Sequence, residues 1–127
     1  MPTPRFKMVV LLVESLPRSV AFYRRLGVAF PEGVEARRDV VVPLSDDHDL
    51  VISETFGKNE PGRAAPGGGA RVMLEFFVEA PAEVDRLWAE LTGTGHRSVR
   101  EPFTTDFGAY MCLVDDPDGT TVLVTAG

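Results

Sequence analysis

The stretch Cys112–Thr125, CLVDDPDGTTVLVT, decides the fold, because two short runs of apolar and β-branched residues flank a tight turn. The turn is Asp116-Pro117-Asp118-Gly119. Pro117 has the fixed φ that suits the second turn position, and Gly119 readily adopts backbone angles that other residues resist. The pattern therefore predicts a β-hairpin.

A strand followed by a helix is predicted further upstream, in Val9–Gly27 (VVLLVESLPRSVAFYRRLG). Ser15 suits the position before the helix and Gly27 suits the position after it. Residues 28–39 read as a loop or a weak edge strand, and the Gly- and Pro-rich residues 56–71 as a linker or a mobile flap. The pattern predicts further strands at Val40–Leu44, Leu50–Thr55, Val72–Glu79, Val99–Phe103 and Ala109–Val114, and a helix at Pro81–Leu91.

The two halves of the chain repeat one another. Val13-Glu14 corresponds to Val78-Glu79, and Phe22-Tyr23 corresponds to Leu87-Trp88 at the same offset. The turn Ser45–Asp49 matches Asp115–Gly119, with a few extra residues in the second half. The repeat predicts a single domain, 1–127, built from one module at about 5–56, a linker at 57–70 and a second module at about 71–127.

Composition narrows the class of protein. The 127 residues are 44% apolar and 25% charged, which is ordinary for a compact globular domain. The net charge of −6 and the pI near 4.8 disfavour nucleic acid and anionic membranes as partners, and are compatible with a cationic ligand. One cysteine allows no intrachain disulfide and favours a reducing cytoplasmic location, and no apolar run reaches membrane-spanning length.

Taken together, VVLLVESLPRSVAFYRRLG and LVDDPDGTTVLV resemble the vicinal-oxygen-chelate superfamily, which includes glyoxalases, extradiol dioxygenases, fosfomycin-resistance enzymes and bleomycin-resistance proteins. The resemblance extends over nearly the whole chain. It implies an α+β fold in which two paired βαβββ modules form a curled mixed sheet around a cleft. It also implies that the protein is a homodimer.

The resemblance further implies where a metal would bind. Metal-dependent members hold a divalent cation with His or carboxylate side chains on the first and last strands of each module. These positions fall here on Met8, Ser53, Met73 and Leu123. Thioether, hydroxyl and alkyl groups are poor ligands for hard or borderline cations, and His48 reads as part of a solvated turn. We therefore predict no metal and no other cofactor.

Strand alternation assigns the neighbours of these positions to the cleft. Glu75 lies within the apolar run MLEFF, where burying an unpaired carboxylate is costly. It would fix a cationic ligand or act as a general base; alternatively, it is solvated or paired with an arginine. Phe107 either stacks on a planar ligand or packs against the protein. The predicted cleft comprises Met8, Val10, Ser53, Met73, Glu75, Phe77, Phe107, Met111, Leu113 and Leu123.

These features favour a metal-free protein, similar to the bleomycin-resistance branch, that sequesters a planar or cationic antibiotic or metabolite. The alternative is an enzyme of the same superfamily. It would be a lyase or isomerase with Glu75 as base, or a dioxygenase-like enzyme with non-standard metal ligands. A regulatory or partner-binding domain would instead require a large exposed apolar patch outside the cleft.

Overall fold

The structure is a computed structural model that describes residues 7–55 and 72–126, and the predicted linker at 57–70 lies outside these ranges. The chain divides into two compact units, 1–24 with 28–65 and 25–27 with 66–127. The mixed α+β class is confirmed. The elements in chain order are β1 (Met8–Leu12), α1 (Leu16–Arg25), the 3-10 turn η1 (Val34–Ala36), β2 (Asp39–Pro43), β3 (Asp49–Ser53), β4 (Met73–Val78), α2 (Pro81–Gly93), β5 (Ser98–Thr104), β6 (Tyr110–Asp115) and β7 (Thr121–Ala126).

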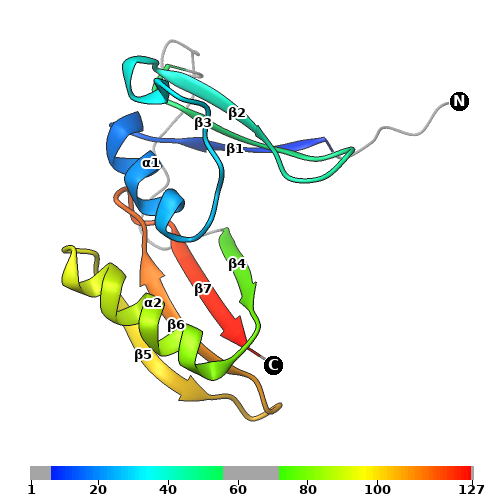
Figure 1. The fold of residues 1–127 in the computed structure, drawn as a ribbon, viewed down its shortest axis with the longest axis vertical. Helices are drawn as coiled ribbons and strands as arrows, with labels where there is room; N and C mark the ends of the chain where they lie inside the picture. Colours follow the sequence, from blue (N-terminus) through cyan, green and yellow to red (C-terminus); the bar gives the residue numbers. More distant parts are fainter. Residues whose placement is uncertain (1–6, 56–71, 127) are drawn as a thin grey trace, which may run out of the picture. The chain divides into compact units, whose positions relative to one another are not determined.

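The sheet of the first unit has the strand order β1-β3-β2, with β1 parallel and β2 antiparallel to β3 (Figure 1). Residues 28–36 form a loop ending in η1, so the weak edge strand is not formed there. Gly33 takes a φ of 77°, outside the extended region that a strand requires. The buried apolar side chains come from alternate strand positions and from α1, and include Leu11, Leu16, Val20, Phe22, Tyr23, Val40, Val42, Leu50 and Ile52.

Two side chains satisfy the amino-terminal N–H groups of α1. Ser15 Oγ accepts a hydrogen bond from Arg18 N at 3.3 Å, as predicted for a capping residue. Glu54, just beyond β3, accepts a second one from Leu16 N, with Oε2 at 2.5 Å. A carboxylate at this end of a helix is also favoured by the helix dipole. The helix is thus attached to its own sheet by a contact that sequence spacing does not reveal.

The sheet of the second unit has the order β4-β7-β6-β5 and completes a βαβββ module. β4 runs parallel to β7, and the other neighbouring pairs are antiparallel. Helix α2 covers one face of this sheet (Figure 1). The side chains buried between them are Val84, Leu87 and Leu91 from the helix and Cys112, Val114, Val122, Val124 and Ala126 from the sheet.

The predicted hairpin joins β6 to β7. Asp116 N donates to Thr120 O at 2.8 Å, and Gly119 N donates to Asp116 O at 3.1 Å. Gly119 has a φ of 89°, so the turn ends in the left-handed residue common in three-residue hairpin loops. The Asp116 carboxylate accepts hydrogen bonds from Asp118 N and Thr120 N, each at 2.9 Å. The hairpin prediction is confirmed.

The strand registers correct one detail of the repeat. Val10 pairs with Val51 in the first module, whereas its counterpart Glu75 pairs with Leu123 in the second. Val51 is therefore the counterpart of Leu123, and the predicted equivalence of Ser53 with Leu123 is wrong by two positions along the strand. The two hairpin turns are therefore two residues out of step with the correspondence predicted from the sequence.

Among the described residues, neither helix combines the length and the apolar character that crossing a bilayer requires.

Candidate functional site

The candidate site lies on the face of the second sheet that points away from α2. Cys112 and Val114 are fully buried on the helix side, so Met111 and Leu113, which alternate with them along β6, point to the opposite face. Leu113 pairs with Leu123 of β7, which in turn pairs with Glu75 of β4. This open face therefore carries side chains from β4, β6 and β7.

An irregularity in β5 adds two more side chains to the same face. Arg100 pairs with Leu113 and Phe103 pairs with Met111, so three steps along β5 match two steps along β6. In a regular strand, residues three apart point to opposite faces. The bulge, which contains Pro102, brings both Arg100 and Phe103 to the open face. A proline is tolerated there because β5 is an edge strand.

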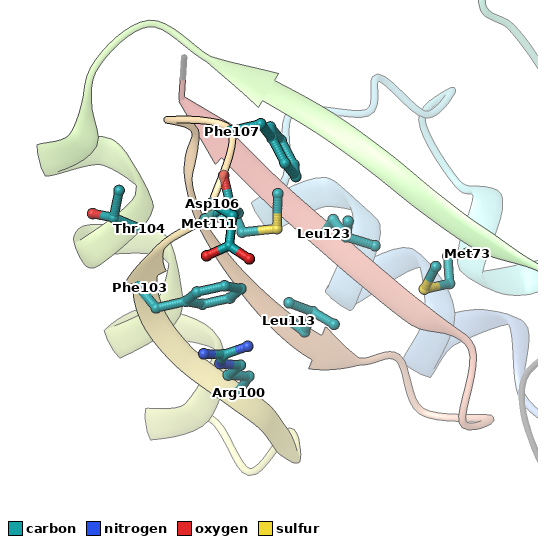
Figure 2. Close-up of a pocket in the computed structure, with 10 residues that line it drawn as sticks. Met73, Arg100, Phe103, Thr104, Asp106, Phe107, Met111, Leu113 and Leu123 are labelled. Atoms are coloured by element: carbon teal, nitrogen blue, oxygen red, sulfur yellow. The ribbon is translucent and has the colours of Figure 1, made fainter.

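A pocket of about 500 Å³ opens on this face (Figure 2). This volume is within the range of sites for small organic ligands, roughly 300–1,000 Å³. Its central wall is apolar, and its polar groups come from β5 and from the loop between β5 and β6. The lining residues are Met73, Arg100, Phe103, Thr104, Thr105, Asp106, Phe107, Met111, Leu113 and Leu123.

The loop after β5 is held by hydrogen bonds among its own residues. Thr105 N donates to Ala109 O at 2.7 Å, and Ala109 N donates to Thr105 Oγ1 at 2.9 Å. Gly108, with a φ of 90°, donates its N–H to Thr105 O at 3.1 Å. These contacts place Asp106 and Phe107 at the tip of the loop, where the Phe107 side chain is 80% exposed.

The structure brings together the predicted residues Met73, Phe107, Met111, Leu113 and Leu123 in this pocket. Sequence reasoning missed the polar part of the lining, which is Arg100, Thr104, Thr105 and Asp106, together with Phe103. The available signal was Pro102, because a proline inside an otherwise regular strand pattern indicates a bulge or an edge.

Glu75 and Phe77 lie on the same face of β4 as Met73 but are not among the pocket-lining residues. Glu75 is exposed, and its Oε2 accepts a hydrogen bond from Thr125 Oγ1 at 2.9 Å. Glu75 is therefore neither buried nor unpaired. Its role as a general base or cation-binding group stays a prediction.

Met8, Val10 and Ser53 belong to the first unit. Met8 pairs with Asp49 and Leu12 pairs with Ser53, so Met8 and Ser53 lie at opposite ends of the ladder between β1 and β3. The Ser53 hydroxyl donates to the Asp39 carboxylate, and Thr55 Oγ1 donates to Asp39 Oδ1 at 2.8 Å. The hydrogen bond from Ser53, followed by that from Thr55, lowers the pKa of Asp39 below its usual 3.8. Ser53 therefore acts here as a partner of Asp39.

The donor chemistry does not fit the divalent cation that metal-dependent relatives bind. In the second module, the positions where ligands would stand carry the Met73 thioether and the Leu123 alkyl side chain. Within residues 7–55 and 72–126, no group of three or more His, Cys, Asp or Glu residues is placed to hold a metal ion. The open face is instead suited to contacts with an organic molecule.

Tyr110 and Cys112 point away from the open face. Cys112 is fully buried on the helix side, and the Tyr110 hydroxyl donates to Asp85 Oδ1 of α2 at 2.6 Å. The hydrogen bond to Asp85 raises the pKa of Tyr110. On the same side, Trp88 Nε1 donates to Ser98 Oγ of β5 at 2.9 Å. These contacts anchor the sheet to α2 and leave the opposite face for a ligand.

Comparison with solved structures finds the same fold in several proteins. A hypothetical protein from S. aureus superposes with a TM-score of 0.80 at 20% identity, covering 99% of this chain and 96% of that one. A glyoxalase-related enzyme from Fulvimarina pelagi gives 0.78 at 20% identity, with coverages of 98% and 89%. A glyoxalase/bleomycin resistance protein/dioxygenase family enzyme from Burkholderia phytofirmans PsJN gives 0.77 at 16% identity, with coverages of 94% and 96%.

Searching the curated proteins by sequence gives no significant match. The family model for the Glyoxalase/Bleomycin resistance protein/Dioxygenase superfamily matches residues 5–124. This match spans nearly all of the 127 residues, and the fold of the second module agrees with it. The chain belongs to the glyoxalase/bleomycin resistance protein/dioxygenase superfamily.

Proposed function

We propose that this protein binds a small, flat organic molecule in the pocket of its second module and holds it through side chains, without a metal ion. The observation that carries the proposal is the pocket itself, about 500 Å³ on the open face of the sheet. Met111, Leu113 and Leu123 provide an apolar surface, and a few polar groups stand at one side. This combination is typical of small-molecule sites.

The shape of the lining favours a planar ligand. Met73 and Met111 are flexible and polarizable, so they adjust to the surface of a flat ring. Phe107 is held at the loop tip with most of its side chain exposed, which leaves its ring available for stacking. These side chains provide contacts for binding a ligand. We therefore propose that the protein sequesters an antibiotic or a metabolite.

The direct test is calorimetric titration with three naphthalene derivatives of different charge: naphthoate, naphthylmethanol and naphthylmethylammonium. We expect saturable binding of at least one of them to protein treated with a chelator. Leu113→Trp places a large ring on the pocket wall, so it should weaken that binding at least about tenfold. Glu79→Gln, at an exposed position outside the lining, is the control and should bind as the wild type does.

Thermal unfolding of each variant shows whether the fold is retained. Binding that is unchanged in folded Leu113→Trp would place the ligand elsewhere. Binding that requires added Zn²⁺, Ni²⁺, Mn²⁺ or Fe²⁺ would contradict the metal-free part of the proposal. Absence of binding by all three compounds would contradict the proposed use of the pocket.

A further inference from the structure

The Arg100 guanidinium is held in the pocket by an aromatic ring. Its central carbon lies 3.4 Å from the centroid of the Phe103 ring, which is the distance of a close stacked contact. The bulge in β5 makes the contact possible, because it brings both side chains to the open face. Since the guanidinium is planar, stacking occupies its face and leaves the N–H groups along its edge directed outward.

Among the described residues, no carboxylate is paired with this guanidinium. Other arginines of the same unit are engaged: Arg97 Nη1 lies 3.3 Å from Asp115 Oδ2, and Arg86 Nη2 lies 2.8 Å from Glu83 Oε2. The Arg100 side chain forms neither an ion pair nor a hydrogen bond with any residue in 7–55 or 72–126. It is the cationic member of the pocket lining, and its donors are available to a ligand.

We propose that the ligand carries an anionic group, a carboxylate or a chemically similar oxyanion, which meets the edge of the Arg100 guanidinium. The flat apolar part of the ligand then lies on Met111, Leu113 and Leu123. Arginine donates two parallel hydrogen bonds to a carboxylate, so the pairing fixes orientation as well as charge. This inference rests on the proposed function, and it reverses the charge preference expected from Glu75.

Two sources of negative charge oppose such a ligand. The net charge of −6 acts over a long range, but physiological salt screens charges more than about 8 Å apart. Asp106 also lines the pocket. In Figure 2 the Phe103 ring lies between the Asp106 carboxylate and the Arg100 side chain. Asp106 should therefore weaken the attraction without neutralising Arg100 through an ion pair.

The experiment measures the selectivity of the wild type and of four variants for the same three naphthalene compounds. We expect naphthoate to bind roughly fivefold more tightly than naphthylmethanol, the ratio that one solvent-exposed ion pair supports. Naphthylmethylammonium should bind least tightly. Arg100→Gln should abolish the ratio while leaving naphthylmethanol binding unchanged, and Arg100→Lys should retain part of it. The preference should shrink as sodium chloride is added.

Asp106→Asn also tests whether the ligand is anionic, but this substitution should strengthen binding where Arg100→Gln weakens it. Removing this carboxylate should tighten naphthoate binding, whereas Glu79→Gln should leave the ratio unchanged because Glu79 is an exposed residue outside the lining. Equal affinities of naphthoate and naphthylmethanol for the wild type would overturn the anionic ligand while leaving the pocket as a binding site. Tighter binding of naphthylmethylammonium than of naphthoate would overturn the proposal and favour a cationic ligand. If none of the compounds binds, the proposed function itself fails.

Discussion

Cys112 is the residue at which burial alters chemistry most directly. Its side chain is fully buried between α2 and the sheet, and burial raises the pKa of its thiol from 9.0 to about 11. Because the thiolate is the reactive form, we expect Ellman's reagent at pH 8 to modify the native protein far more slowly than protein unfolded in guanidinium chloride. Rapid, complete modification of the native protein would contradict this placement.

The same shift has a consequence for stability. The folded-state pKa of Cys112 is raised, so the folded protein favours the neutral thiol. The contribution of this thiol to the free energy of unfolding is therefore fully present below about pH 9. It is then lost as the pH rises toward about 11. We expect Cys112→Ser to reduce this part of the alkaline loss of stability, measured by urea denaturation at several pH values. An identical pH dependence in Cys112→Ser and wild type would argue against a buried thiol.

At the scale of elements, α1 depends on a residue that belongs to another part of the chain. Glu54 accepts a hydrogen bond from Leu16 N across 38 residues of sequence. Loss of a helix cap costs about 1 kcal/mol, so Glu54→Ala should lower the free energy of unfolding by roughly 1–2 kcal/mol. Glu54→Gln retains an acceptor and should lose less. Glu32→Ala, at an exposed loop position, is the control and should have little effect.

The β6–β7 hairpin provides a second test at this scale. Gly119 has a φ of 89°, which costs residues with a Cβ roughly 1–2 kcal/mol, so Gly119→Ala should destabilise the protein by about that amount. Gly93, the last residue of α2, does not have a positive φ, and no atom within 4 Å would meet an added Cβ. Gly93→Ala should therefore be neutral or mildly stabilising. Equal effects of both substitutions on urea denaturation would contradict the turn geometry.

The elements with strong local signals were predictable from the sequence. The DPDG turn and the apolar periodicity of α1 and α2 depend on residues close together in the chain, and all three elements were found. The bulge in β5 was not predicted, because it depends on how β5 pairs with β6. A shift in that pairing changes the face to which Arg100 points. In the sequence, Pro102 was the only sign of the bulge.

At the scale of the whole molecule, the candidate site was predictable in its apolar part only. Family resemblance and strand alternation identified Met111, Leu113 and Leu123, because the turn fixes the register of β6 and β7. Arg100 and Asp106 were missed, since an irregular edge strand and a loop place them. For Met8, Val10 and Ser53, a place in the site stays a prediction.

Metal content is also a property of the whole molecule. Because the side chains at the expected ligand positions are unsuited to hard or borderline cations, protein purified without chelator should contain well under one equivalent of Zn, Ni, Mn or Fe per chain. Inductively coupled plasma mass spectrometry measures this content. A stoichiometric metal that survives dialysis would show that ligands outside the described residues complete a centre.

Metal-free binding in the pocket is tested most directly by the methyl NMR spectrum of protein labelled at methionine, titrated with the three naphthalene compounds in the presence of EDTA. Met73 and Met111 line the pocket, and their methyl signals are assigned with Met73→Leu and Met111→Leu. We expect saturable shifts of both signals with at least one compound. Unchanged Met73 and Met111 signals with all three compounds, or shifts that occur only after a divalent metal is added, would contradict it.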